Sequence, residues 1–276
     1  TAYDLGVRLV GSEMCIRDSL LPTIRIRDNL DIPPHQYQLV INGSTRGRGD
    51  IQLGKFLAIN PGSVLENVSG TETKEPAFGL DAVWIDARDK KYAQAVGYTV
   101  VDTSTVIATH LNSVLRDNAE ELLTYEITQH LIDRIEESSP KLIEELIPDN
   151  LSMSVIVKVL QNLLAEGVPI KDMRSILETL SDVAPYTKTP EALTNYVRAK
   201  LGRLIVQQLC DPMETLEVIT LEPNLEQILT DLVKSASNIE EVTLEPNLAQ
   251  TLIESLSEEV TNAQENERAA ILIVSP

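Results

Sequence analysis

The residues that could carry acid–base or metal chemistry are three histidines and several adjacent glutamates. His35, His110 and His130 fall on three different expected elements, so they form no ligand set, and His110 is expected on a helix surface. The glutamate pairs lie on polar helix faces, where solvated carboxylates are the ordinary outcome. These pairs are Glu120-Glu121, Glu136-Glu137 and Glu144-Glu145. The sequence therefore predicts no general acid–base pair and no catalytic residue.

Other short motifs lack the partners that their chemistry needs. Gly43–Gly49 (GSTRGRG) has neither the lysine nor the following helix of a phosphate-binding loop. Cys15 and Cys210 are far apart and have no Cys-x-x-Cys neighbourhood, which argues against a disulfide framework or a zinc site and favours a reducing compartment. We therefore expect no metal and no cofactor.

The net charge of the chain restricts the classes of partner that it is expected to bind. The net charge is −19, and residues 203–276 carry 14 acidic against 3 basic side chains. Such a field repels phosphate backbones, so we expect no nucleic-acid binding, whereas a basic partner is compatible with it. No run approaches the roughly 18 apolar residues that a membrane-spanning helix needs, so we expect no spanning segment in this stretch.

Both ends of the sequence look irregular. Residues 7–19 (VRLVGSEMCIRDS) resemble a translated sequencing adapter, so we predict that residues 1–19 are an artefact or disordered. At the other end, an apolar strand over Ala269–Val274 is followed by Pro276 without a closing element, which predicts truncation.

The elements that position the remaining residues begin with strands. Alternating apolar residues predict strands around Ile24–Ile26 and Tyr37–Ile41, with a hairpin-like bend over Gly43–Gly49. A third extended segment is expected over Asp50–Ile59, and residues 62–74 are expected to be a polar loop.

Residues 75–111 predict a strand–helix–strand–helix unit. Leu80–Ile85 and Tyr98–Val101 suit buried strands. Asp86 can cap the helix that ends at Gly97, and Asp102–Ser104 can cap a helix over Thr105–Leu123. The strand signal then stops, and residues 123–202 predict an all-helical module.

Pro140 and Pro190 stand at the starts of two of the helices expected in the second half of the chain. Four helices are expected there: 141–147, 152–165, 170–183 and 190–204. A short strand is expected near Leu216–Leu221. The segment TLEPNL then occurs twice, from Thr220 and from Thr243, and each copy predicts a helix entry.

Phe78 is one of only two phenylalanines and stands beside Pro76 and Gly79. An aromatic side chain in such a setting suits a hydrophobic anchor for a protein partner. From the residues alone, an ordinary core position is equally compatible with Phe78.

Long collinear segments resemble the cytoplasmic region of the FlhA family of flagellar and type III secretion export-gate proteins. The segments are LPTIRIRDNL (21–30), FLAINPG (56–62), EPAFGLDAVWI (75–85), GYTVVDTSTVIATHL (97–111), KVLQNLLAEGVPIKDMRSILETL (158–180) and ALTNYVRAKLGRLI (192–205). The amino-acid sequences of these segments are closer to those of the flagellar members than to those of the injectisome members of the family.

The resemblance implies an α+β fold of four subdomains: two small α/β subdomains, a helical one and a truncated α/β one. The expected boundaries are 20–53 plus 103–122, then an inserted 54–102, then 123–202, then 203–276. It also implies a membrane domain in the full-length protein, at the bacterial inner membrane, with this region on the cytoplasmic face.

The resemblance further implies a function and partners. Nine copies would form a ring that binds export chaperones with their substrates and passes the substrates to the membrane pore, without enzymatic activity. The ATPase complex and the substrate-specificity switch protein are the other implied partners.

The family's chaperone-docking site maps onto seven positions of this sequence. They are Pro61, Glu75, Phe78, Leu80, Val101, Val106 and Thr109. The family's flagellar members carry aspartate where this chain has Glu75, so the charge is retained on a side chain that is one methylene longer.

The same residues are compatible with three further functions. The chain could be an injectisome homologue of the flagellar protein, or a free helical adaptor. The third is a small-molecule enzyme that uses the strand–helix–strand unit over residues 80–101.

Overall fold

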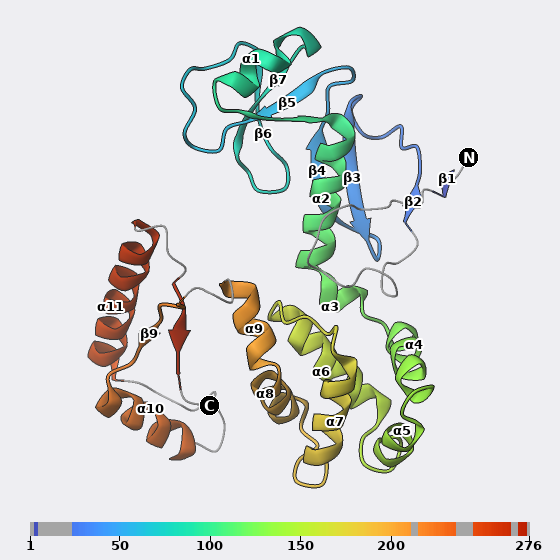
Figure 1. The fold of residues 1–276 in the computed structure, drawn as a ribbon, viewed down its shortest axis with the longest axis vertical. Coiled ribbons are helices and arrows are strands. Elements are labelled where there is room, and N and C mark those ends of the chain that lie inside the picture. Colours follow the sequence, from blue (N-terminus) through green and yellow to red (C-terminus); the bar gives the residue numbers. More distant parts are fainter. Residues whose placement is uncertain (1–2, 5–23, 211–214, 236–244, 266–269, 275–276) are drawn as a thin grey trace. The chain divides into compact units, whose positions relative to one another are not determined.

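The computed structural model describes residues 3–4, 24–210, 215–235, 245–265 and 270–274. The chain divides into two compact units, Thr1–Thr194 and Asn195–Pro276, and each is described by itself below. Strands dominate the first hundred residues and helices most of the rest, so the predicted α+β class is confirmed (Figure 1). The adapter-like residues 7–19 lie outside the described part, and the four-subdomain division stays a prediction.

The first unit opens with short antiparallel pairs. β1 (Tyr3–Asp4) pairs with β2 (Arg25–Ile26), and β3 (Gln36–Ile41) forms a hairpin with β4 (Ser44–Asp50). The hairpin turn consists of Asn42 and Gly43 alone, both with positive φ, as a two-residue turn requires. The predicted bend over Gly43–Gly49 is therefore wrong, because residues 44–50 are themselves a strand.

Glycines in β4 make room for rings on neighbouring elements. A Cβ atom on Gly47 would lie 2.8 Å from Nε2 of His110 in α2 (Thr103–Asp117), and one on Gly49 would lie 2.6 Å from the Tyr37 ring. Glycine weakens a strand because it loses more conformational entropy on folding, but here its lack of a side chain permits close packing. Figure 1 shows α2 running alongside this hairpin, in contact with β4.

A four-stranded antiparallel sheet follows, in the order β6-β7-β5-β8. Its strands are β5 (Phe56–Ile59), β6 (Thr71–Lys74), β7 (Asp81–Ile85) and β8 (Thr99–Asp102). The extended segment expected over 50–59 is thus divided between β4 and β5. The loop expected over 62–74 is wrong at its end, because Thr71–Lys74 pairs with β7 through its backbone although it contains no apolar residue.

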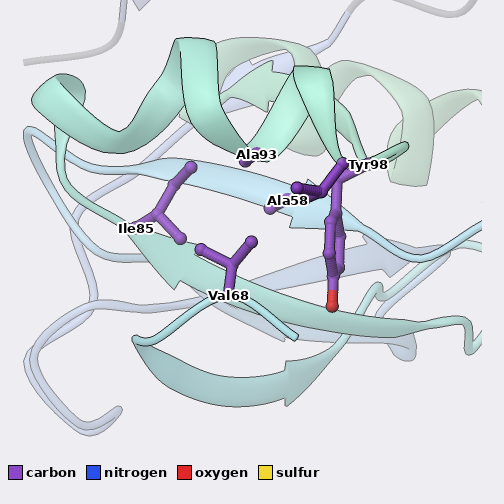
Figure 2. Close-up of a cluster of buried hydrophobic side chains, with 6 residues drawn as sticks. Ala58, Val68, Ile85, Ala93 and Tyr98 are labelled. Carbon is purple, nitrogen blue, oxygen red and sulfur yellow. The ribbon is translucent and has the colours of Figure 1, made fainter. Parts of the chain in front are cut away.

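Each face of this sheet has its own core. On one face lies α1 (Lys90–Ala95), preceded by a 3₁₀ turn (Ala87–Asp89), and Figure 2 shows the buried side chains between helix and sheet. They are Ala58, Val68, Ile85, Ala93, Val96 and Tyr98. On the other face, Val106 of α2 packs with Leu57, Ala82 and Trp84. Cross-strand partners share a face, so this second face also carries Thr71, opposite Trp84, and Thr73, opposite Ala82.

The predicted end of α1 and the predicted start of α2 are confirmed, but the helix predicted over Thr105–Leu123 is divided between α2 and α3 (Ala119–Leu122). Gly97 follows α1 with φ of 103°, the left-handed conformation that ends many helices. Asp102 caps α2 by accepting a hydrogen bond from the Thr105 N–H at 2.7 Å, and this bond lowers the pKa of the Asp102 carboxyl. Asp86 precedes the 3₁₀ turn but makes no side-chain cap bond.

Helices follow one another through the rest of the first unit. Their bounds are α3 (Ala119–Leu122), α4 (Tyr125–Glu136), α5 (Pro140–Leu146), α6 (Met153–Ala165), α7 (Met173–Val183) and α8 (Pro190–Lys200), the last of which continues into the second unit. The core here is aliphatic, and Ile156, Leu160, Leu163, Ile176 and Leu180 are each fully buried. No separate helix was predicted over 125–136. Helices α5 to α7 match predicted helices, whereas the single helix predicted over 190–204 is divided between α8 and α9 (Gly202–Leu209).

The second unit contains α9 (Gly202–Leu209), β9 (Ile219–Thr220), α10 (Pro223–Ser235), α11 (Pro246–Glu265) and β10 (Leu272–Ile273). β9 and β10 are parallel neighbours, and both helices begin at the proline of a TLEPNL copy, as predicted. In the first copy the Glu222 carboxylate accepts the Asn224 and Leu225 N–H groups. Among the described residues beyond 202, none is buried.

The glycine packing in β4 gives a first prediction. Gly49→Ala should lower the free energy of unfolding by about 1–3 kcal/mol, because its Cβ would collide with the Tyr37 ring. Trp84, the single tryptophan and 2% exposed, reports unfolding of the sheet through its fluorescence in urea. Gly202→Ala, where no atom lies within 4 Å of the new Cβ, is the control. Equal stability of the two variants would contradict the packing argument.

Candidate docking site

The loop over residues 75–80 connects β6 to β7 and is closed by its own hydrogen bonds. The Glu75 N–H donates to the Leu80 carbonyl at 2.8 Å, and the Gly79 N–H donates to the Glu75 carbonyl at 2.9 Å. Gly79 has φ of 71°, a conformation that glycine adopts without strain. At the base of the loop, Lys74 Nζ lies 2.9 Å from Asp81 Oδ1. The loop is thus a defined turn.

Glu75 holds this loop from inside. Its side chain is buried, 2% exposed, and its two carboxylate oxygens accept the N–H groups of Ala77 at 3.0 Å and Phe78 at 2.7 Å. Hydrogen bonds to a charged acceptor are stronger than neutral ones, and they offset part of the cost of burying the charge. The family resemblance placed Glu75 among the partner-contacting residues, but here its carboxylate accepts hydrogen bonds from the backbone of its own loop.

The apolar side chains of the loop point outward. Phe78 is 67% exposed and Leu80 is 43% exposed, so in the unbound chain Phe78 does not occupy a core position. Pro61 is also exposed and lies at the same end of the sheet. The Asn60 N–H donates to the Asp81 carbonyl at 2.8 Å, and the Asn60 side chain accepts the Gly62 N–H at 2.8 Å. These bonds tie the Pro61 turn to the base of the 75–80 loop.

The remaining predicted positions lie beneath this surface. Val106 is buried and Val101 is half-buried in the cluster of Leu57, Ala82 and Trp84. Thr109 is half-buried and follows Val106 by three residues, so the two share one side of α2. The structure therefore separates the predicted set into exposed residues (Pro61, Phe78 and Leu80), half-buried ones (Val101 and Thr109) and buried ones (Glu75 and Val106).

A buried polar cluster that was not predicted lies close to Glu75. His110 is 5% exposed, and its Nδ1 lies 2.7 Å from the Tyr37 hydroxyl, so the expectation of a surface histidine is wrong. Burial lowers the pKa of His110, although the nearby Glu75 carboxylate acts in the opposite direction. Burial also raises the pKa of the Tyr37 phenol to about 12, assisted by the Glu75 and Asp50 carboxylates. Gly47 and Gly49, two residues apart, were the sequence signal for two closely packed rings.

Most of the histidines and paired glutamates considered for catalysis or metal binding are exposed in the described part of the chain. The described part of the chain has no group of three or more His, Cys, Asp or Glu side chains placed to hold a metal ion. His35 and His130 are exposed, as are the Glu136-Glu137 and Glu144-Glu145 pairs, while Glu121 forms an ion pair with Arg46. No described helix is long and apolar enough to cross a membrane.

Comparison with known proteins assigns the chain to a family. Residues 16–276 match the FHIPEP family. The chain belongs to the FHIPEP family. It is 48% identical, over 78% of its own length, to the flagellar biosynthesis protein FlhA of Proteus mirabilis. The resemblance to the FlhA family that the sequence carries is thereby confirmed, which connects the chain to flagellar biosynthesis and protein transport.

Solved structures of related proteins share the fold. The Chlamydia pneumoniae CdsV protein, in its complex with CdsO, matches 95% of this chain and 85% of its own, with a TM-score of 0.73 at 21% identity. The nonameric EscV cytosolic domain from a type III secretion system matches 92% of this chain and 81% of its own, with a TM-score of 0.64 at 19% identity. The chain spans 31% of the length of the Proteus mirabilis protein.

The Glu75 contacts give a second prediction. Glu75→Ala should lower the free energy of unfolding by about 1–3 kcal/mol, because it leaves two partly buried N–H groups without an acceptor. The measurement is urea unfolding followed by Trp84 fluorescence. Glu72→Ala removes an exposed carboxylate from the preceding strand and should change stability by no more than about 0.5 kcal/mol. Similar losses in both variants would show that the loop does not depend on Glu75.

The Tyr37–His110 contact gives a third prediction. Because the folded state holds the Tyr37 proton up to about pH 12, while an ordinary tyrosine releases it near pH 10, stability should fall as pH rises through this window. Tyr37→Phe removes the titrating group and should make this fall shallower. Urea unfolding at a series of alkaline pH values measures the difference, and parallel slopes for the two proteins would contradict it.

Proposed function

We propose that this chain is a docking platform of the flagellar type III protein export gate. In this proposal it binds export chaperones with their bound substrates and passes the substrates to the membrane pore, and it does so without catalysis. The full-length protein would sit in the bacterial inner membrane with this region on its cytoplasmic face. The ATPase complex and the substrate-specificity switch protein are the further partners that we propose.

The observation that carries the proposal is the exposed Phe78 on an internally bonded loop. Because the side chain is exposed and its loop is fixed before binding, little conformational entropy is lost when a partner binds. Leu80 on the same loop and Pro61 on the adjoining turn add apolar surface, and the Lys74–Asp81 pair supplies a polar edge. A central aromatic with a polar rim is the usual composition of a protein-binding hot spot.

The other predicted site residues have supporting roles in this proposal. Glu75 fixes the loop conformation, and Val101 and Val106 fix the sheet on α2 beneath it. Thr109, half-buried beyond Val106, can offer its hydroxyl at the border of the site. Substitutions at these positions would act mainly through the shape of the surface, whereas Phe78 would act by direct contact.

Relatives support a ring in a flagellar export gate. The nonameric EscV domain shares the fold, which supports a ring of nine copies for the full-length protein. The match to a flagellar relative, at 48% identity, is much stronger than the matches to CdsV and EscV, at 21% and 19%. We therefore prefer the flagellar export gate to an injectisome homologue.

A fourth prediction tests the site directly. Phe78→Ala should weaken binding of a flagellar chaperone–substrate complex by roughly 10- to 100-fold, the cost of truncating an aromatic hot spot. Its stability should stay within about 0.5 kcal/mol of the unaltered chain, because the side chain is already exposed. Isothermal titration calorimetry measures the affinity. Tyr186→Ala, which removes an aromatic that is 87% exposed elsewhere on the chain, is the matched control. An unchanged affinity of the Phe78 variant would refute the site.

A further inference from the structure

The edge strand β6 leads directly into the Phe78 loop and has an open side. In the described part of the chain, β6 pairs with β7 alone and forms one end of the four-strand order. An open sheet edge presents a row of backbone N–H and C=O groups that another extended chain can pair with. The edge and the candidate docking loop are therefore continuous along the chain.

The register shows which backbone groups face outward. The Glu75 N–H bonds the Leu80 carbonyl, and residues 74, 73, 72 and 71 then oppose 81, 82, 83 and 84 in turn. Bonded and non-bonded pairs alternate along an antiparallel ladder, so Thr71 and Thr73 exchange bonds with β7. The N–H and C=O groups of Glu72 and Lys74 consequently point away from β7, toward the open edge.

A cleft of about 490 Å³ lies beside this edge. It is lined by Thr71–Thr73 of β6, by residues 50–53, and by His35, Lys55 and Trp84. The volume falls within the range of about 300–1,000 Å³ that is usual for binding clefts. Leu53 is 71% exposed in this lining and can pack against an apolar side chain.

The charges at this edge favour a basic residue in the occupant. Glu72 is exposed and forms no ion pair with any described residue, and Asp50 contributes a second carboxylate to the cleft. The neighbouring Lys74 is neutralised by Asp81 at 2.9 Å, which leaves the strand itself negative. Lys55, also in the lining, balances only part of this charge.

We infer that β6 accepts an extended segment of the exported polypeptide, bearing a basic residue opposite Glu72, as an additional strand. This inference rests on the proposed function, since it assigns the Phe78 loop to the chaperone and the adjoining edge to the cargo. A folded partner without an extended segment cannot make these backbone bonds, so the edge distinguishes loaded from empty chaperones.

Hydrogen exchange resolved to single amides tests the inference on the complete chain. In the free chain the amides of Glu72 and Lys74 should exchange quickly, whereas those of Thr71 and Thr73 are protected by β7. Addition of a flagellar chaperone bound to its substrate should slow exchange at Glu72 and Lys74 by about tenfold or more. The chaperone alone should leave both amides fast.

A pair of variants isolates the backbone bond. Glu72→Pro removes the outward N–H and places a ring at the edge while it spares the bonds to β7, and proline is tolerated at edge positions. It should weaken binding of the loaded complex about fivefold to tenfold beyond the effect of Glu72→Ala, which removes only the charge. Trp84 fluorescence in urea confirms that both variants are folded.

The outcomes separate this inference from the proposed function. Binding of the loaded complex without protection at Glu72 and Lys74 overturns the strand pairing and leaves the docking site standing. Protection by the chaperone alone overturns the assignment of the edge to cargo. Absence of any binding overturns both proposals.

Discussion

The buried carboxylate of Glu75 is the constraint on which the exposed surface depends. A charge removed from water must be compensated, and here the compensation comes from two backbone N–H groups of its own loop. Those bonds fix residues 75–80 in one turn, and the turn directs Phe78 outward. An aspartate at this position would reach one methylene less far, so the length of the side chain bears on the shape of the loop.

The same carboxylate is coupled to the two rings behind it. Tyr37 and His110 form a hydrogen bond 73 residues apart in sequence, and the Glu75 charge influences the pKa of both. Gly47 and Gly49 let β4 approach these rings. The polar cluster therefore joins β3, β4 and α2 with the candidate docking loop, so the surface is supported by elements distant in sequence.

Sequence patterns predicted the elements whose signals are local. Asp102 and Gly97 mark the ends of helices by hydrogen bonding and backbone conformation. Apolar alternation marks β3, and a short apolar run marks β7. Strand β6 escaped prediction because Thr-Glu-Thr-Lys has no apolar residue, and only its pairing with β7 makes it a strand. His110 was misassigned because its burial depends on Tyr37 and on glycines in another strand.

For the candidate site too, the positions could be predicted from the sequence, but their burial could not. The family resemblance predicted which positions form the site, but residue type alone did not distinguish Glu75, which is buried, from Phe78, which is exposed. Exposure is set by the closure of the loop through its own backbone bonds and by the bond between Asn60 and Asp81, which joins separate segments.

In the proposed function, Phe78 itself touches the chaperone. The most direct measurement replaces Phe78 with a photoreactive benzoylphenylalanine, which keeps an aromatic side chain at the tip, and maps crosslinks to a chaperone–substrate complex by mass spectrometry. Crosslinks to the chaperone are expected from position 78, and none from position 186 when Tyr186 is substituted in the same way. Absence of crosslinks from position 78, with the complex still bound, would contradict it.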